Sequence, residues 1–78
     1  MHHKELKDKD MYEILEKAGL TEEIAACSRK VRMMRNLLIY RYVYQMNREE
    51  VCAKLDFISL RTYNNILTKA LAKIGKYI

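Results

Sequence analysis

The sequence predicts an all-α protein, a small bundle of about four helices in a single domain over residues 1–78. Half of the residues are hydrophobic, which is sufficient for one modest core. The chain has no proline and only two glycines, whereas a β-rich domain needs more turn-forming residues. No apolar run approaches the roughly 18 residues of a membrane-spanning helix, and the start lacks the apolar region of a signal peptide. We therefore expect a cytoplasmic protein without membrane contact.

Residues 1–20 are expected to contain an acidic N-terminal helix, within the stretch `DKDMYEILEKAGL`. An apolar stripe at helical spacing gives this helix one buried face. The stripe consists of Met11, Ile14, Leu15 and Ala18. Gly19 stands where a residue in the left-handed conformation commonly ends a helix.

Residues 21–45 are expected to form a long basic helix, with Thr21 as its N-cap. Its apolar stripe consists of Ile24, Cys27, Val31, Met34, Leu38 and Tyr42. The stretch `LLIYRYVY` is also rich in strand-forming residues. Helix is favoured there, because a single strand without a partner leaves its backbone unpaired. A break between residues 28 and 36 stays open as an alternative, because about 25 residues is long for a helix in a globular protein.

Residues 47–77 have the pattern of two helices joined by a very short turn. Asn47 is followed three residues later by Glu50, which predicts a capping box at the start of the first helix. Its buried face consists of Val51, Cys52 and Leu55, and `DFIS` forms the turn. Ser59 caps the second helix, expected over 59–76. The buried stripe of that helix consists of Tyr63, Ile66, Leu67, Ala70, Leu71 and Ile74.

A short helix, a tight turn and a longer helix in apolar register indicate a helix-turn-helix. In that arrangement the second helix, the recognition helix, enters the major groove of DNA. The residues expected to contact DNA are Ser59, Leu60, Arg61, Asn64, Asn65, Thr68 and Lys69. Arginine pairs with guanine and asparagine with adenine through two hydrogen bonds each, whereas Ser59 and Lys69 suit phosphates.

The last 40 or so residues resemble a known family. The stretch `YRYVYQMNREEVCAKLDFISLRTYNNILTKALAKI` is similar to the C-terminal part of the ArpU/RinA-type phage transcriptional regulators, which in turn resemble the promoter-reading helix-turn-helix domain of sigma factors. The shared features are an Arg-Tyr-hydrophobic helix end, a short acidic helix, a Ser-x-Arg-Thr-Tyr start and an Ala-Leu-x-x-hydrophobic tail. The matched residues are Arg41, Tyr42, Val43, Glu49, Glu50, Val51, Leu55, Ser59, Arg61, Thr62, Tyr63, Ala70, Leu71 and Ile74.

Two positions depart from the family pattern, both in the turn. The family commonly has glycine near the position of Asp56, and Ile58 is an extra residue. A longer turn changes the tilt expected of the recognition helix, and with it the register of the base contacts. The resemblance implies a transcriptional regulator that binds double-stranded DNA, with RNA polymerase as a further partner to consider.

The charge is unevenly distributed, in a way that favours a polyanionic partner for the C-terminal part. Residues 1–28 carry four lysines and seven acidic residues, whereas residues 29–78 carry eleven basic and three acidic residues. The arginines between Arg29 and Arg41 either follow phosphates or are simply solvated, and the sequence does not separate these two interpretations. We also predict a homodimer, because one small core is not expected to bury all of the apolar residues, such as Ile39, Val43 and Ile78.

No enzymatic activity, cofactor or metal site is expected. The chain has no nucleophile–base–acid set and no glycine-rich phosphate loop. His2 and His3 have no third ligand nearby, and Cys27 and Cys52 are interpreted as small core residues. The alternative function is a small helical adaptor that binds another protein, such as a polymerase or terminase component, through its acidic N-terminal helix.

Overall fold

The computed structural model describes residues 8–77, and the expected all-α class is confirmed there, with no strand among these residues. Five α-helices follow one another along the chain, together with a π-helical turn and a final 3₁₀ turn. They are α1 (Asp8–Lys17), α2 (Glu22–Cys27), α3 (Arg29–Leu38), the π-helical turn η1 (Ile39–Val43), α4 (Arg48–Lys54), α5 (Leu60–Ile74) and the 3₁₀ turn η2 (Gly75–Tyr77). No helix within the described part is long and apolar enough to cross a membrane.

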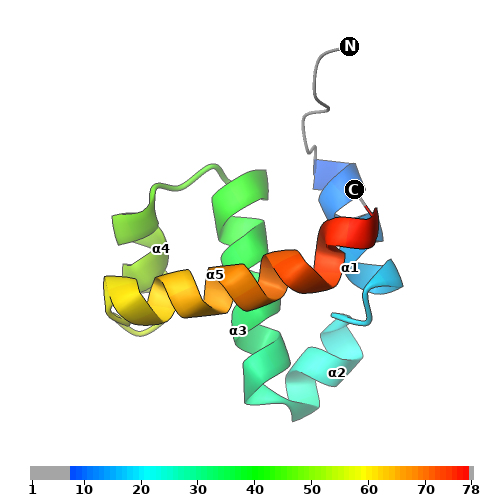
Figure 1. Ribbon diagram of the computed structural model, residues 1–78, viewed down its shortest axis with the longest axis horizontal. Coiled ribbons are helices and arrows are strands. Elements are labelled where there is room, and N and C mark those ends of the chain that lie inside the picture. The colour runs from blue at the N-terminus through cyan, green and yellow to red at the C-terminus, as the bar shows by residue number, and fades with distance from the viewer. Residues whose placement is uncertain (1–7, 78) are drawn as a thin grey trace.

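The helices are arranged around the crossing of α3 and α5. Figure 1 shows α5 lying across α3, with α4 beside the first turns of α5. The end of α5 shares a buried hydrophobic cluster with α1. α2 packs against the start of α3, and η1 extends α3 until it contacts α1. The first half of α5 is therefore held by α3 and α4, and its second half by α1 and α3.

The single helix expected over 21–45 is wrong, because the chain breaks at Ser28. Ser28 has an extended backbone (φ −126°, ψ 118°), ends α2 and caps α3, with its hydroxyl oxygen 3.4 Å from the Val31 N–H group. This break lies in the range left open by the sequence, and it raises the number of α-helices from four to five. The competing strand in `LLIYRYVY` does not form, since these residues complete α3 and build η1.

The break also changes which side chains of α2 are buried. Ile24 and Cys27 were expected in the apolar stripe, but both are exposed, and Ala25 is the buried residue of α2. A stripe counted through one continuous helix loses its phase at Ser28, because each residue of an α-helix advances the face by about 100°. From Val31 onward the expected stripe is partly or fully buried.

Two hydrophobic clusters form the core, and α5 contributes to both. The larger cluster joins α1, α3, η1 and the end of α5 through Met11, Ile14, Leu15, Leu20, Met34, Leu38, Ile39, Ala70 and Ile74. The smaller cluster joins α3, α4 and the start of α5 through Leu37, Val51, Cys52, Leu55 and Tyr63. Ile66 and Leu67 pack against both clusters, so α5 connects the two clusters.

The helix-turn-helix pattern has its expected caps and buried residues. Asn47 and Glu50 form the capping box, with N–H to oxygen distances of 2.8 and 3.0 Å. Ser59 caps α5 by accepting the Thr62 N–H group at 3.1 Å. The buried stripe of α5 is confirmed for Tyr63, Ala70 and Ile74, and Ile66 and Leu67 are partly buried. Leu71 was expected in the same stripe but is exposed.

The turn between α4 and α5 adopts an unusual backbone. Asp56 (φ 66°) and Phe57 (φ 58°) both have the left-handed conformation, which favours glycine. Position 56, near which the ArpU/RinA-type regulators commonly have glycine, therefore has a left-handed backbone in this protein. The extra residue Ile58 is partly buried against the smaller cluster, and its N–H group donates to the Cys52 carbonyl oxygen at 3.2 Å. The additional residue is thereby tied to α4.

Candidate nucleic-acid interface

α5 presents a polar face opposite its buried stripe. Tyr63 and Ala70 point into the core, whereas all of the residues predicted to contact DNA are exposed. Among these, Arg61, Asn65 and Thr68 follow the i, i+4, i+7 spacing that places them on the side of the helix directly away from the core. The predicted base-reading residues therefore share one exposed helix face.

The remaining predicted residues lie at the edges of this face. Asn64 and Lys69 flank the central row on opposite sides, as their positions along the helix require. Leu60 is 44% exposed and belongs to a different surface, since it lines an apolar hollow with Phe57 and Ile58. The structure thus brings Arg61, Asn64, Asn65, Thr68 and Lys69 together and sets Leu60 at their border.

Two hydroxyl groups of the predicted site are already used within α5. The Ser59 oxygen accepts the Thr62 N–H group, and its hydroxyl donates to the Thr62 side chain at 3.1 Å. The Thr68 hydroxyl donates to the Asn64 carbonyl oxygen at 2.8 Å. A hydroxyl has one hydrogen to donate, so in this conformation Ser59 and Thr68 are left as acceptors. The donors facing outward are therefore chiefly Arg61, Asn64, Asn65 and Lys69.

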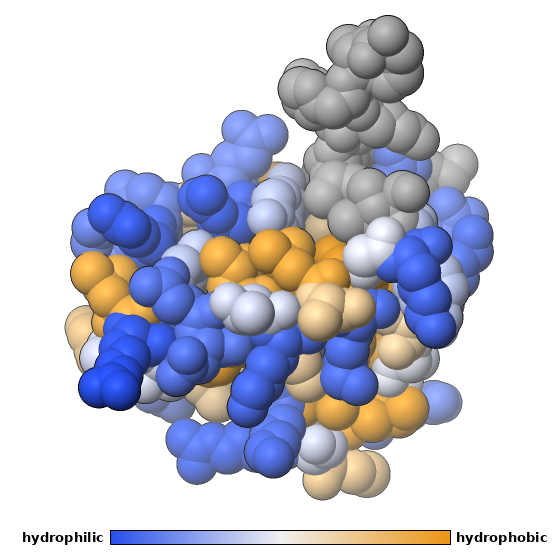
Figure 2. Space-filling model, viewed as in Figure 1, coloured by the Kyte–Doolittle hydropathy of each residue, from blue (hydrophilic) through white to orange (hydrophobic). Residues whose placement is uncertain are grey.

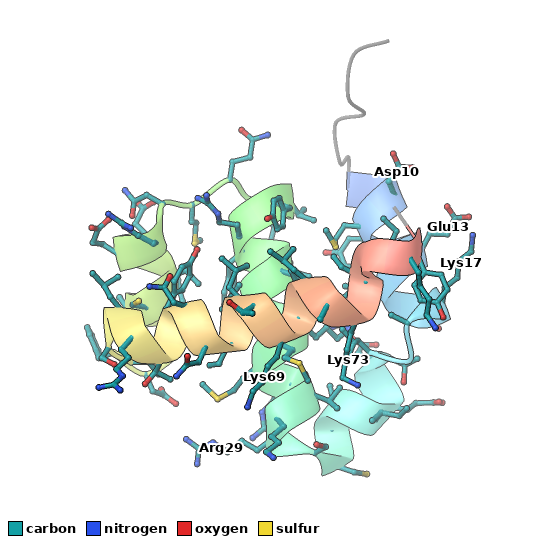
Figure 3. The ribbon with its side chains drawn as sticks, viewed as in Figure 1. Asp10, Glu13, Lys17, Arg29, Lys69 and Lys73 are labelled. Carbon is teal, nitrogen blue, oxygen red and sulfur yellow. The ribbon has the colours of Figure 1, made fainter. Side chains whose placement is uncertain are left out.

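The charges around α5 are divided between two sides of the molecule. Figure 3 shows Lys69 and Lys73 pointing from α5 to the side where Arg29 begins α3, whereas Asp10 and Glu13 lie on α1 at the far end. In Figure 2, hydrophilic residues predominate on the left and lower parts of this face, with hydrophobic groups at the left edge and at the lower right. Within the described residues the one ion pair is the exposed Arg48–Glu49 contact, at 3.9 Å. The cations beside α5 are therefore not neutralised by close carboxylates.

A second group of cations was not singled out from the sequence. Arg29 and Arg32 of α3 come together with Lys54 at the end of α4, around a hollow beside the turn into α5. The sequence leaves open whether the arginines of α3 contact phosphates, and it gives no signal for Lys54. The i, i+3 spacing of the two arginines places them on one helix face, but only the fold shows that Lys54 lines the same hollow.

Two of the three tyrosines near the end of α3 pack against the core. Tyr40 and Tyr44 have ring centroids 6.0 Å apart with the rings tilted by 37°. Tyr40 packs against the smaller cluster and Tyr42 against the larger one, whereas Tyr44 is 56% exposed. These contacts connect η1 to both parts of the core.

The apolar residues that suggested a dimer are placed differently. Ile39 is buried, and Val43 is half-buried against the larger cluster. Ile78 lies outside the described residues, as do His2 and His3. The two described residues therefore fit inside the monomer and supply no surface for a dimer.

The two cysteines have different environments. Cys52 is buried as expected, but Cys27 is exposed, which corrects its assignment to the core. Burial, reinforced by the nearby Glu49 carboxylate, raises the pKa of the Cys52 thiol. The small Cys52 side chain sits in the smaller cluster, where α4 and α5 pack together.

The chain matches no protein-family model, no curated protein and no solved structure. The resemblance of its C-terminal part to the ArpU/RinA-type regulators therefore stays a prediction.

Proposed function

We propose that the protein is a cytoplasmic transcriptional regulator that binds double-stranded DNA in a sequence-specific manner, with α5 as its recognition helix. The exposed polar face of α5 carries this proposal. That face holds one arginine, two asparagines and one lysine on a helix whose opposite side is fixed in the core. The major groove admits an α-helix, and these side chains make paired contacts with purines and phosphates.

Each polar residue has a distinct role in this proposal. Arg61 reads guanine, and Asn64 and Asn65 read adenine. Lys69 holds a phosphate at the edge of the groove. Ser59 fixes the start of α5 through its cap, and leaves the Leu60 and Arg61 N–H groups of the first turn for a phosphate.

The first test measures the contribution of Arg61 to base recognition. A preferred site is selected from a pool of random duplexes, and affinity is then measured by fluorescence anisotropy at two salt concentrations. Arg61→Ala should weaken binding to that site by about 1–3 kcal/mol and relax the preference for one sequence. The domain should stay folded, because the Arg61 side chain is exposed.

Lys69 and Lys17 provide a matched pair of variants for testing the electrostatic contribution to DNA binding. Lys69→Ala should weaken all duplexes similarly and lower the slope of log affinity against log salt by about one. Lys17→Ala removes the same charge from α1, at the far end of the molecule in Figure 3, and should change the slope much less. Duplex affinity that survives Arg61→Ala and Lys69→Ala in folded protein would end the DNA-binding proposal.

A helical adaptor is the second candidate function, and the exposed ring of Phe57 is the observation that favours it. Phe57 is 83% exposed in a strained conformation, next to the apolar hollow that contains Leu60. Phe57→Ser should then abolish binding to a protein partner, with RNA polymerase as the first to test, and should leave duplex affinity unchanged. A homodimer on DNA stays part of the main proposal, and light scattering with and without duplex tests it.

A further inference from the structure

The cations at the junction of α3 and α4 define a second feature of the surface. Arg29, Arg32 and Lys54 line a hollow of about 290 Å³ together with Met33, Asn36, Leu55 and Asp56. The α3 residues of this set follow the i, i+3, i+4, i+7 spacing of one helix face. All three cationic side chains are exposed, and none has an ion pair within the described part of the chain.

The charge of this hollow favours an anion. Three cations face a single carboxylate, that of Asp56, so the balance is positive. The start of α3 adds partial positive charge and the end of α4 adds partial negative charge, so the two helix ends roughly offset one another. Asn36 offers an amide hydrogen for a neutral contact, and Met33 and Leu55 give the arginine stems an apolar support.

The place of the hollow links it to α5. Lys54 ends α4, Leu55 is its C-cap, and Asp56 begins the turn that leads into the recognition helix. In Figure 3, Arg29 lies on the same side of α5 to which Lys69 and Lys73 point. A duplex whose major groove receives the polar face of α5 would bring the backbone of one strand along this side.

We propose that Arg29, Arg32 and Lys54 hold a phosphate of the DNA backbone, so that the α3–α4 junction anchors the strand beside the recognition helix. This inference rests on the proposed DNA-binding function and adds a specific phosphate site to it. A phosphodiester carries one negative charge, which the positive balance of the hollow attracts. Arginine supplies the paired N–H donors that suit phosphate oxygens.

The test compares cations inside and outside the hollow. Arg32→Gln and Lys54→Gln should each weaken duplex binding by about tenfold, because each loses a charge-assisted hydrogen bond. Lys30→Gln and Arg41→Gln remove the same charge from exposed positions of α3 and η1 that do not line the hollow. These controls should weaken binding by less than about threefold. Equal losses of affinity in the hollow variants and the control variants would overturn the inference. General electrostatic attraction between the basic protein and the DNA would then explain both losses.

Asp56→Asn tests the same site in the opposite direction. Asparagine tolerates the left-handed backbone of position 56, so the fold should be retained. Loss of the carboxylate should strengthen duplex binding by about threefold at low salt. An unchanged or weakened affinity in this variant would count against an anion in the hollow.

A neutral backbone linkage locates the contact. Duplexes carrying one methylphosphonate at successive positions should reveal a position where the substitution weakens wild-type binding but has little further effect on Arg32→Gln. Additive losses at every position would refute a specific phosphate contact. Saturable binding of inorganic phosphate at micromolar concentration, seen at Arg32 by NMR and without effect on duplex affinity, would assign the hollow to a free ligand instead.

The outcomes separate this inference from the proposed function. If Arg61→Ala weakens duplex binding while Arg32→Gln and Lys30→Gln lose the same affinity, the role of the recognition helix is supported and the phosphate site is refuted. If Arg61→Ala and Lys69→Ala bind duplex DNA like the wild type, the proposed function and the phosphate site are both refuted. Circular dichroism of each variant confirms that the fold is intact before affinities are compared.

Discussion

The two hydrophobic clusters differ in size and in what they support. The larger cluster buries nine residues from α1, the segment that follows it, α3, η1 and α5, whereas the smaller one buries five around α4 and the start of α5. The candidate DNA-reading face lies over the smaller cluster, while the larger one supports the other end of α5. The part of the molecule that positions this candidate face therefore has the smaller core, and it also has hydrogen-bonded helix caps.

This difference predicts how the two regions respond to the loss of a core side chain. Stability should depend on both clusters, because Ile66 and Leu67 couple them through α5. The angle between α4 and α5 should depend mainly on the smaller one, since α4 has no residue in the larger cluster. Affinity for DNA is thus expected to be more sensitive to the smaller cluster than stability alone would indicate.

The largest expected effect is that of Tyr63→Ala. Tyr63 is 2% exposed and is the only buried residue that α5 gives to the smaller cluster, so its loss should lower the free energy of unfolding by roughly 3–5 kcal/mol. Leu15→Ala in the larger cluster should cost roughly 2–5 kcal/mol. Urea denaturation followed by circular dichroism measures both.

Duplex affinity of the same variants sharpens the comparison. Affinity is measured well below the melting temperature of each variant. Leu15→Ala should then bind duplex DNA almost like the wild type, whereas Tyr63→Ala should bind it more weakly. Tyr63→Leu retains part of the burial and replaces Tyr63→Ala if the latter does not fold. Equal loss of affinity in the Leu15 and Tyr63 variants would mean that the two clusters behave as one unit.

A smaller effect is expected from the helix caps. The Asn47 side-chain oxygen accepts the Glu50 N–H group at 2.8 Å, and Asn47→Ala removes this bond while the Asn47 N–H group can still donate to the Glu50 carboxylate. The free energy of unfolding should fall by about 1–2 kcal/mol. Thr21 makes a single cap bond of 3.2 Å at the start of α2, and Thr21→Ala should cost about 0.5–1 kcal/mol. Thermal melts compare the two. A larger loss at Thr21 would contradict the greater importance of caps around α4.

These caps also explain how much was predictable from the sequence. Asn47, Glu50 and Ser59 are local signals, readable from neighbours three residues away, and the helix-turn-helix was predicted nearly to its bounds. The break at Ser28 has no proline or glycine to mark it, so the stripe through Ile24 and Cys27 was misjudged. The exposed face of α5 followed from periodicity.

The remaining features depend on contacts between distant residues. Lys54 joins Arg29 and Arg32 only because the fold brings the end of α4 and the start of α3 to one hollow, and no spacing in the sequence encodes that. Likewise, the burial of Ile39 depends on the π-helical turn that carries it toward α1. Periodicity along one helix cannot reveal which face of another helix it meets.

The two cysteines extend the comparison to chemical reactivity. At pH 8 one thiol, that of Cys27, should react rapidly with Ellman's reagent, and Cys52 should react only on unfolding. The raised pKa of the folded Cys52 thiol means that the folded state holds its proton more tightly than the unfolded state. Cys52 therefore contributes stability that is present below the unfolded pKa and is lost as pH rises through the folded pKa. Two rapidly reacting thiols in the native protein would show that the smaller cluster opens readily.

The last two expected effects, each of about 1 kcal/mol or less, concern the left-handed positions of the two regions. Gly19 (φ 82°) occupies such a position after α1, whereas the turn before α5 uses Asp56 and Phe57. A Cβ at Gly19 would meet no atom within 4 Å, so Gly19→Ala tests backbone strain alone and should cost about 1 kcal/mol.

Phe57→Gly should have the opposite sign. An L-residue in the left-handed region is strained by roughly 1–2 kcal/mol, and glycine removes this strain while adding about 0.4–1 kcal/mol of unfolded-state entropy. The ring is 83% exposed, so little burial is lost. A net gain of roughly 0.5–1 kcal/mol is expected from these two terms. Phe57→Ala is the control, because it removes the ring but keeps the strain, and it should be nearly neutral. If Phe57→Gly is no more stable than Phe57→Ala, the turn into α5 is not strained, and the contrast with Gly19 disappears.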